Sequence, residues 1–178
     1  MCDAETVTKI ANYLRVPPGK IAYNNEKIVT RTVKNKTVSG FTTILTALCN
    51  ESNAEIVKNG QTSIEVECLV QQWIEYAVLY IAPGSKDKHI AQNLLRDLNT
   101  YLLKRSYFVG QAMTLADLAV FYTIHNLVKS LSPLDKENYL NLSRWFDHLQ
   151  QNAKIRQGHE LINFNTIYLH GWATGTHK

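Results

Sequence analysis

Asp117 is the residue whose type and setting best suit catalysis. It lies in the stretch "GQAMTLADLAVFYTIH", residues 110–125, just ahead of a long apolar run. A carboxylate in such surroundings could act as a general acid or base, but that chemistry needs a second titrating group at a suitable spacing. His125, two helical turns further on, is itself surrounded by apolar residues and offers no evident partner. We therefore interpret Asp117 as structural.

The spacing of Thr114 and Asp117 predicts a helix-capping box. Thr114 at the N-cap would accept from the N–H of Asp117, and the Asp117 carboxylate would reach back to the N–H of Thr114. Met113 and Leu118 would pack together as a hydrophobic staple, and the negative charge suits the helix dipole. Because the following helix is apolar nearly all round, we expect it to cross the core. Loss of the cap would then cost ~1–2 kcal/mol.

Other chemistry-bearing residues form no recognisable site. Cys2 and Tyr23 are candidate nucleophiles by residue type only, because nothing nearby in sequence would activate them. Cys49 and Cys68 lie among apolar residues and are expected to be core thiols, and the three cysteines suggest neither a disulfide framework nor a zinc pair. The six histidines lack metal-ligand spacing, and the glycines form no phosphate loop. We expect neither a metal nor a cofactor.

Composition is typical of a folded, non-membrane protein. The 178 residues are 45% hydrophobic and 19% charged, with a net charge of +4. Neither a signal-peptide pattern in "MCDAETVTKI" nor an apolar window near ~18 residues is present, so cytosol or nucleus is the default. Lys and Arg are scattered in pairs, which permits weak RNA contact but does not argue for a dedicated nucleic-acid surface.

The elements expected to position these residues fall into two parts. Residues 1–60 read as a small α+β unit, with a helix over 4–15, a two-stranded hairpin turning at "KNK" and a second helix after Gly40. Ser39 could cap that second helix. From residue 61 the pattern is helical throughout.

Two later helix starts and a tail complete the expected organisation. Thr62 with Glu65 suggests a capping box for a helix ending at Pro83-Gly84, and Ser132 with Pro133 is a strong helix start. Residues 158–178 read as an extended tail without sustained periodicity. Its expected contacts with the body of the protein are Phe164, Tyr168 and Trp172.

Four segments carry a family resemblance: "VQQWIEY", "LLRDLNTYL", "GQAMTLADLAVFYTIH" and "KENYLNLSRWFDHLQ". A Thr-x-x-Asp box after "YFVGQ" resembles the C-terminal domain of the glutathione S-transferase (GST) fold. The segments together resemble the GST-like auxiliary subunits of the multi-aminoacyl-tRNA synthetase complex, strongly over residues 66–157 and more loosely over 1–60. The resemblance implies an α+β, predominantly helical, GST-like fold. It would have a reduced thioredoxin-like unit at 1–60, an all-α domain at 61–157 and a tail at 158–178.

The resemblance implies a scaffold rather than an enzyme. A glutathione transferase needs a nucleophile after its first strand, a cis-proline and an acid-Ser pair. Here a helix comes first, Val29 stands where the proline is expected, and Val38-Ser39-Gly40 replaces the pair. We therefore expect no catalytic activity. A divergent glutathione-dependent transferase is the alternative.

The resemblance also implies two docking surfaces. The first is the helix after the hairpin, through Thr42, Leu45 and Thr46, although these could equally be ordinary helix positions. The second is the "SRWF" helix, where Arg144 would stack on a partner's Arg and Asp147 would fix it or receive the partner's Arg. The local alternative for the second is an ordinary Arg144–Asp147 pair.

The implied partners are the GST-like domains of methionyl- and glutamyl-prolyl-tRNA synthetases. The same resemblance implies support of translation, nuclear entry and a DNA-damage role beside a cytoplasmic location, although no basic import signal is visible. Homodimerisation of the isolated chain stays open. Direct tRNA binding is the weakest of the hypotheses, and it would require affinity to fall steeply with salt.

Overall fold

The N-terminal part consists of helices packed beside a small antiparallel sheet. The computed structural model of the protein describes residues 4–165. The sheet has the order β1-β2-β3. Its strands pair in the registers Ala22↔Thr30 and Thr32↔Thr37. The elements of this part are α1 (Ala4–Leu14), β1 (Lys20–Tyr23), β2 (Val29–Val33), β3 (Lys36–Ser39), α2 (Phe41–Glu51) and α3 (Glu55–Asn59).

The sheet therefore has one strand more than the sequence predicted. β1 is four residues long and largely exposed, so it shows no alternation of apolar and polar residues. The predicted turn is present: Lys34 and Asn35 both have positive φ, at 45° and 65°. This matches the two-residue hairpin connection in which both central residues are left-handed.

Arg31 connects the sheet to α2 and to the loop that contains Pro17 and Pro18. Its side chain is 2% exposed, and its guanidinium donates to both carboxylate oxygens of Glu51, at 2.7 and 2.8 Å. It also donates to the carbonyls of Pro17 (2.8 Å) and Pro18 (3.1 Å). The Arg31 guanidinium holds the pKa of Glu51 below its usual range. A buried cation is tolerated here because it is paired and its donors are satisfied.

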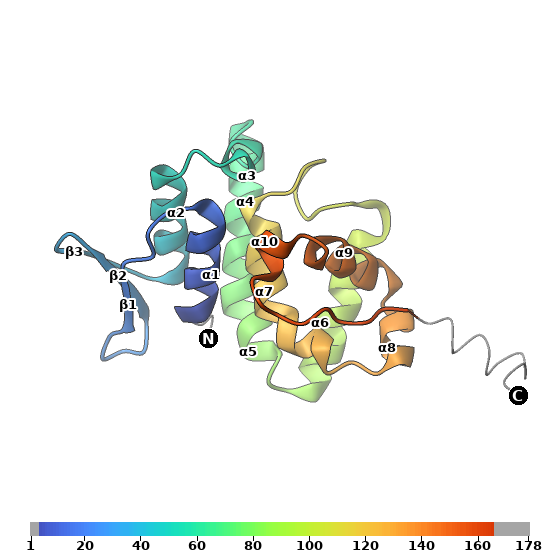
Figure 1. Ribbon diagram of the computed structural model, residues 1–178. Helices are drawn as coiled ribbons and strands as arrows, with labels where there is room; N and C mark the ends of the chain where they lie inside the picture. The colour runs from blue at the N-terminus through green and yellow to red at the C-terminus, as the bar shows by residue number, and fades with distance from the viewer. Residues whose placement is uncertain (1–3, 166–178) are drawn as a thin grey trace, which may run out of the picture.

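The second part is a helical bundle built around α7. Figure 1 shows the sheet at one edge of the molecule, α1 and α2 beside it, and the long α4 and α7 at the centre. Its elements are α4 (Ile64–Tyr76), a π-helical turn (Ala77–Ile81), α5 (Ala82–Gly84), α6 (Lys88–Tyr101), a 3₁₀ turn (Leu102–Lys104), α7 (Leu115–Lys129), α8 (Pro133–Asn138), α9 (Leu140–Gln150) and α10 (Ala153–Arg156). The architecture is thus α+β and predominantly helical, as predicted.

The core of the bundle is rich in aromatic side chains around α7. Leu118, Phe121 and Ile124 are fully buried, as the apolar character of this helix predicted. Trp145 and Phe146 of α9 are also in the core, at 1% and 0% exposure. The rings of Phe121 and Phe146 stack 4.4 Å apart. α9 is therefore fixed against α7 by large rings.

The helix starts are only partly as predicted. Ser132 caps α8 by accepting from the N–H of Asp135 at 3.1 Å, with Pro133 in the first turn, as expected. The predicted cap at Thr62 is wrong, since Ser63 caps α4 and accepts from the N–H of Val66. Ser39 does not cap α2 either; Gly40, at φ 95°, occupies the N-cap position and offers no side chain.

Residues 158–165 form a segment that hydrogen bonds and ring packing hold against the bundle. The buried Gln150 side chain donates to the carbonyl of Ile162 (2.7 Å) and accepts from its N–H (2.9 Å). The Phe164 ring packs 5.9 Å from that of Phe146, as predicted. The predicted contacts of Tyr168 and Trp172 lie outside the described residues. Within the described part, no helix is long and apolar enough to cross a membrane.

Candidate docking surfaces

Asp117 is the centre of a buried hydrogen-bond network. Its Oδ2 accepts from the backbone N–H of Thr114 at 2.9 Å and lies 3.3 Å from the Thr114 hydroxyl, in a capping box. Its Oδ1 accepts from the N–H of Phe108 and from the indole Nε1–H of Trp145, each at 3.0 Å. One carboxylate therefore joins the start of α7, the preceding loop and α9.

The surroundings of Asp117 suit a structural role. The residue is fully buried, and burial raises the pKa of its carboxyl while the hydrogen bonds from Thr114, Phe108 and Trp145 oppose that rise. A group that must transfer protons needs access to a reacting atom, and these donors already occupy both oxygens. The sequence did not indicate the bonds to Phe108 and Trp145, because both partners are distant along the chain. Leu118 is fully buried and Met113 is packed against the core, as a staple would place them.

Of the two candidate nucleophiles, only Tyr23 lies within the described residues. Tyr23 is 44% exposed at the end of β1, and its hydroxyl accepts from the N–H of Ala4 at 3.0 Å. Cys2 lies outside the described residues. Cys49 is half-buried and burial raises its pKa to about 11, which disfavours the thiolate. Cys68 is exposed, so its prediction as a core thiol is wrong. Among residues 4–165, no group of three or more metal-ligating side chains is assembled.

The first docking surface, the α2–α4 face, is an apolar groove along α4 and the π-helical turn. The groove has a volume of about 740 Å³. Ile64, Leu79 and Tyr80 are 73%, 62% and 62% exposed along it. The full lining is Ile64, Glu67, Cys68, Gln71, Gln72, Glu75, Tyr76, Leu79 and Tyr80. Several large apolar side chains exposed together on one surface are typical of a site that binds another macromolecule.

Of the three predicted α2 residues, only Thr46 contacts a residue of this groove. Thr46 is exposed, and its hydroxyl accepts from Nε2 of Gln71 at 3.3 Å, so α2 and the groove share a continuous surface. Thr42 is half-buried one turn earlier, and its carbonyl accepts from the Thr46 hydroxyl at 3.0 Å. Leu45 is fully buried, so its prediction as a contact residue is wrong. Its side chain packs into the core instead.

Sequence reasoning missed the groove, although a signal was present. α4 and the π-helical turn carry apolar residues on more than one face, which exceeds what a single buried stripe requires. The last two groove residues, Leu79 and Tyr80, lie in the π-helical turn. The N–H of Ala82 donates to the carbonyl of Ala77, five residues back, which is the π-helical pattern. Pro83 follows directly and cannot donate a backbone hydrogen bond.

The second docking surface, the α9 face, is centred on Arg144. The guanidinium of this exposed residue donates through Nη2 to the carbonyls of Leu102 (3.1 Å) and Arg105 (2.9 Å). Leu103 and Leu140 are 58% and 59% exposed at neighbouring positions of the 3₁₀ turn and α9. Arg144 is thus held across the end of the 3₁₀ turn, with its planar group at the surface.

Arg144 and Asp147 do not act on each other as the sequence suggested. Asp147 Oδ1 accepts from the side-chain amides of Gln150 (2.7 Å) and Gln151 (3.0 Å), and no Arg144–Asp147 pair is among the ion pairs of the described residues. The carbonyls at the end of the 3₁₀ turn compete successfully for Arg144. That competition involves residues some 40 positions away, so local spacing could not reveal it.

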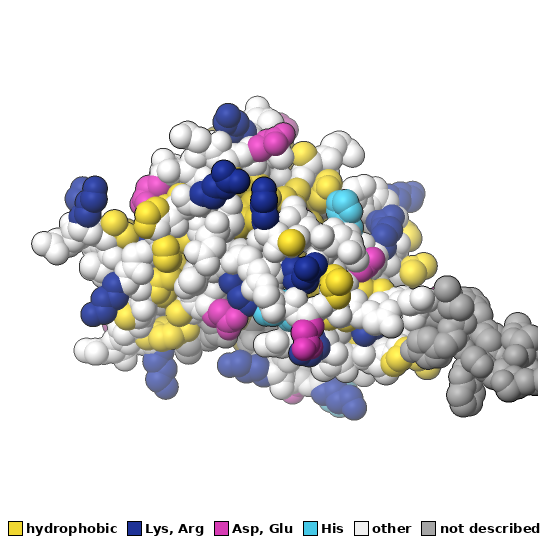
Figure 2. Space-filling model, in the orientation of Figure 1, with side chains coloured by type: hydrophobic (Ala, Val, Ile, Leu, Met, Phe, Trp, Pro, Cys, Tyr) yellow, Lys and Arg dark blue, Asp and Glu magenta, His cyan; other side chains and the backbone are white. Residues whose placement is uncertain are grey.

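On the face seen in Figure 2, Lys and Arg side chains do not gather into a surface suited to nucleic acid. Figure 2 shows Lys and Arg side chains dispersed over the viewed face, with acidic side chains between them. The α2–α4 groove is lined by Glu67 and Glu75, which would repel phosphates. Both observations favour proteins as the occupants of these surfaces.

Comparison with known proteins gives a consistent pattern. A family model described as the nuclear-export cofactor Arc1p matches residues 66–153. Human eukaryotic translation elongation factor 1 epsilon-1 is 40% identical over 142 residues, which span 79% of this chain and 80% of the human protein. The mouse protein of the same name is 38% identical over the same shares. A probable cytoplasmic glutamate–tRNA ligase of Schizosaccharomyces pombe is 30% identical over 48% of this chain and 12% of the ligase.

Solved structures agree on the fold. A glutathione S-transferase from Xylella fastidiosa aligns with a TM-score of 0.66 and 12% identity, covering 86% of this chain and 91% of its own. A chain from binary sub-complexes of the yeast aminoacyl-tRNA synthetase complex aligns with a TM-score of 0.55 and 15% identity, covering 94% and 92%. These similarities show a GST-like fold, as the sequence predicted.

Proposed function

The chain belongs to the family of eukaryotic translation elongation factor 1 epsilon-1, and on that premise we propose that it is a non-catalytic auxiliary subunit of an aminoacyl-tRNA synthetase assembly. The family, the match to the Arc1p model and the fold shared with a yeast synthetase-complex chain support the auxiliary role. The observation that carries the proposal is the α2–α4 groove, with Ile64, Leu79 and Tyr80 exposed along it.

The proposed occupants of the two faces are GST-like domains of synthetases. The α2–α4 face offers apolar side chains with Glu67 and Glu75 among its lining, which fits a partner carrying apolar and basic groups. The α9 face offers Arg144, whose planar guanidinium can stack on another Arg or fork onto a carboxylate. We assign these faces to the domains of methionyl- and glutamyl-prolyl-tRNA synthetases, one to each. This role would place the protein in the cytoplasm; a nuclear, DNA-damage-related role is a further part of the proposal.

The experiment is co-purification with each synthetase domain separately. Tyr80→Glu places a charge in the groove and is expected to weaken one partner by about 30-fold or more, as for an interface hot spot. Arg144→Ala is expected to weaken the other partner by about ten-fold or more. Leu134→Glu, at an equally exposed position on α8, is the matched control and should retain both partners.

The assignment predicts that Tyr80→Glu and Arg144→Ala each lose binding to a different partner. If Tyr80→Glu and Arg144→Ala remove the same partner, or if neither affects binding, the assignment of two faces to two partners is wrong. Thr46→Arg provides a second probe of the α2–α4 face, because Thr46 is exposed and its substitution should leave the core intact. Melting temperatures of all variants separate lost binding from lost folding.

A glutathione-dependent transferase is the second candidate. The observation in its favour is the Tyr23 hydroxyl, a partly exposed phenol whose oxygen accepts from the N–H of Ala4 at the start of α1. Retention on immobilised glutathione, with conjugating activity abolished by Tyr23→Phe, would support it over the scaffold.

A further inference from the structure

A pair of stacked histidines joins α7 to the C-terminal segment. His125 on α7 is 5% exposed, and its Nδ1 has no hydrogen-bond partner in the described part of the chain. Its ring stacks on that of His159, with centroids 3.8 Å apart and an interplanar angle of 23°. Phe121 and Phe146 approach the other sides of the His125 ring, at 6.0 and 5.7 Å. This is an apolar enclosure for a titratable group.

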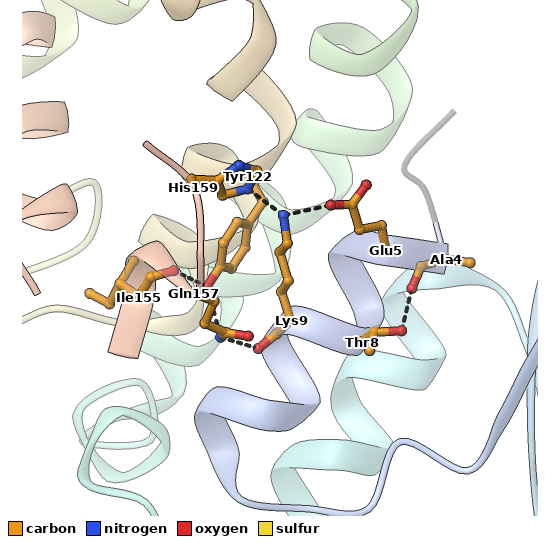
Figure 3. Close-up of polar contacts among 8 residues, drawn as sticks. All are labelled: Ala4, Glu5, Thr8, Lys9, Tyr122, Ile155, Gln157 and His159. Carbon is orange, nitrogen blue, oxygen red and sulfur yellow. Dashed lines mark hydrogen bonds and ion pairs between the residues drawn. The ribbon is translucent and has the colours of Figure 1, made fainter. Parts of the chain in front are cut away.

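Lys9 of α1 completes the cluster. Its Nζ contacts Nε2 of His159 and pairs with Glu5 at 2.6 Å, as Figure 3 shows. A Lys ammonium has donors only, so His159 Nε2 must accept and the imidazole must be neutral in this arrangement. The other charged groups that act on the pair are Lys129 of α7, which acts on both rings, and Glu5, which acts on His159 in the opposite sense.

Protonation would disrupt this arrangement for two reasons. Two imidazolium rings stacked at this distance would repel each other, and a protonated His159 would meet Lys9. The surroundings also favour the neutral form of His125. Burial first, then His159 and Lys9, lower its pKa to about 4. Burial and Lys9 likewise lower the pKa of His159.

Hydrogen bonds on both sides of His159 also hold the segment that carries it. Gln157 donates from Nε2 to the carbonyl of Lys9 at 2.7 Å, which links the segment to α1. Ile162 is clamped by Gln150 of α9, and the Lys136 ammonium donates to the carbonyl of Asn163 at 3.0 Å. The histidine pair is thus the joint at which the segment crosses between α1 and α7.

We propose that His125 and His159 form a proton-sensitive latch, which holds residues 158–165 on α1 and α7 when neutral and releases them on acidification. Both pKa values are lower in the folded protein than in the open chain. The latch is therefore at full strength above the ordinary histidine pKa near 6.5, and it weakens as pH falls through that value towards the folded pKa.

The test is amide hydrogen exchange of the wild-type protein at pH 7.5 and 5.5, corrected for intrinsic rates. The amide of Ile162, bonded to Gln150, reports opening of the segment. Its opening equilibrium should increase by at least roughly ten-fold between the two pH values, because each histidine with a strongly lowered folded pKa contributes up to a factor of about ten one pH unit below its unfolded pKa. Amides of α4, such as that of Ile74, report whether the bundle opens as well and should not show this increase.

Three variants separate the latch from general acid sensitivity. His125→Phe keeps an apolar ring and removes the titrating nitrogen, so most of the pH dependence should disappear. Lys9→Met removes the cation, and it should raise opening at pH 7.5 while reducing the change on acidification. His89→Gln, at an exposed position of α6, is the control and should behave as wild type.

Direct titration of the histidine Cε1–H resonances by NMR decides the case even if a variant fails to fold. A His125 that titrates near 6.5, or an Ile162 amide whose opening does not change between pH 7.5 and 5.5, would overturn the proposal. So would a folded His125→Phe protein that retains the whole response of the wild-type protein.

Discussion

At the scale of single residues, the four donors around Asp117 are all neutral, and their arrangement determines what its removal would do. The N–H groups of Phe108 and Thr114 and the indole of Trp145 have their hydrogen bonds with this one carboxylate. Because the site is buried, water cannot replace the lost acceptor without structural rearrangement. The network therefore contributes more than a surface capping box.

We expect Asp117→Ala to lower the free energy of unfolding by at least about 3 kcal/mol, since three buried donors would each lose a partner at about 1–3 kcal/mol. Urea denaturation measures this loss. The control is Asp135→Ala, which removes an equivalent carboxylate from the Ser132 cap at the surface. Its loss should stay below about 1 kcal/mol, and equal losses in the two variants would contradict the network.

At the scale of secondary-structure elements, the start of α4 distinguishes two neighbouring hydroxyl residues. Ser63 has extended backbone angles and accepts from the N–H of Val66 at 3.3 Å, whereas Thr62 precedes the cap. Ser63→Ala should lower the free energy of unfolding by about 0.5–1 kcal/mol. Thr62→Ala should change it by no more than about 0.5 kcal/mol. Thermal unfolding of the two variants checks the order, and a larger effect at Thr62 would place the cap where the sequence suggested.

The elements show where prediction from sequence succeeds and where it fails. The helix at α7 was predictable, because a Thr-x-x-Asp start followed by an all-round apolar run reflects local chemistry and burial together. β1 was not, because a four-residue exposed strand is defined by its pairing with β2 rather than by its own pattern. Leu45 was misplaced for a related reason, since the outward side of α2 depends on where α1 and the sheet pack.

The resemblance indicated candidate docking surfaces on α2 and α9, and it did not indicate the groove along α4. Two of the groove residues, Leu79 and Tyr80, lie in a π-helical turn that the sequence did not predict. Arg144 was singled out correctly as an exposed residue of α9. Its contacts with the Leu102 and Arg105 carbonyls follow from tertiary packing alone.

At the scale of the whole molecule, a polar junction connects the N-terminal helix to the bundle. The Tyr122 hydroxyl donates to the carbonyl of Ile155 at 2.6 Å and accepts from Nε2 of Gln157 at 3.1 Å. Gln157 in turn binds the carbonyl of Lys9. Burial raises the pKa of Tyr122, so this phenol stays protonated and remains a donor at physiological pH. α7 and the stretch from Ile155 to Gln157 therefore meet at one hydroxyl, and the Gln157 side chain links both to α1.

Tyr122→Phe should lower the free energy of unfolding by about 1–2 kcal/mol, because the Ile155 carbonyl would lose its donor in a buried setting. It should also increase hydrogen exchange in α10 more than in α4, since the loss is local to the junction. Tyr107→Phe is the control, because its hydroxyl contacts His148 at the surface, and it should cost less than about 0.5 kcal/mol. Equal exchange changes in α4 and α10 would show that the junction is not a separate unit.

The anchoring of Arg144 also has a consequence for the kinetics of assembly. A free arginine side chain loses about 2 kcal/mol of rotamer entropy when a partner immobilises it. Here the Leu102 and Arg105 carbonyls have already restricted that motion in the unbound chain. A partner would therefore meet a guanidinium plane in a fixed orientation, and less conformational freedom would be lost on contact. Preorganisation of this kind lengthens the lifetime of a complex without requiring a larger interface.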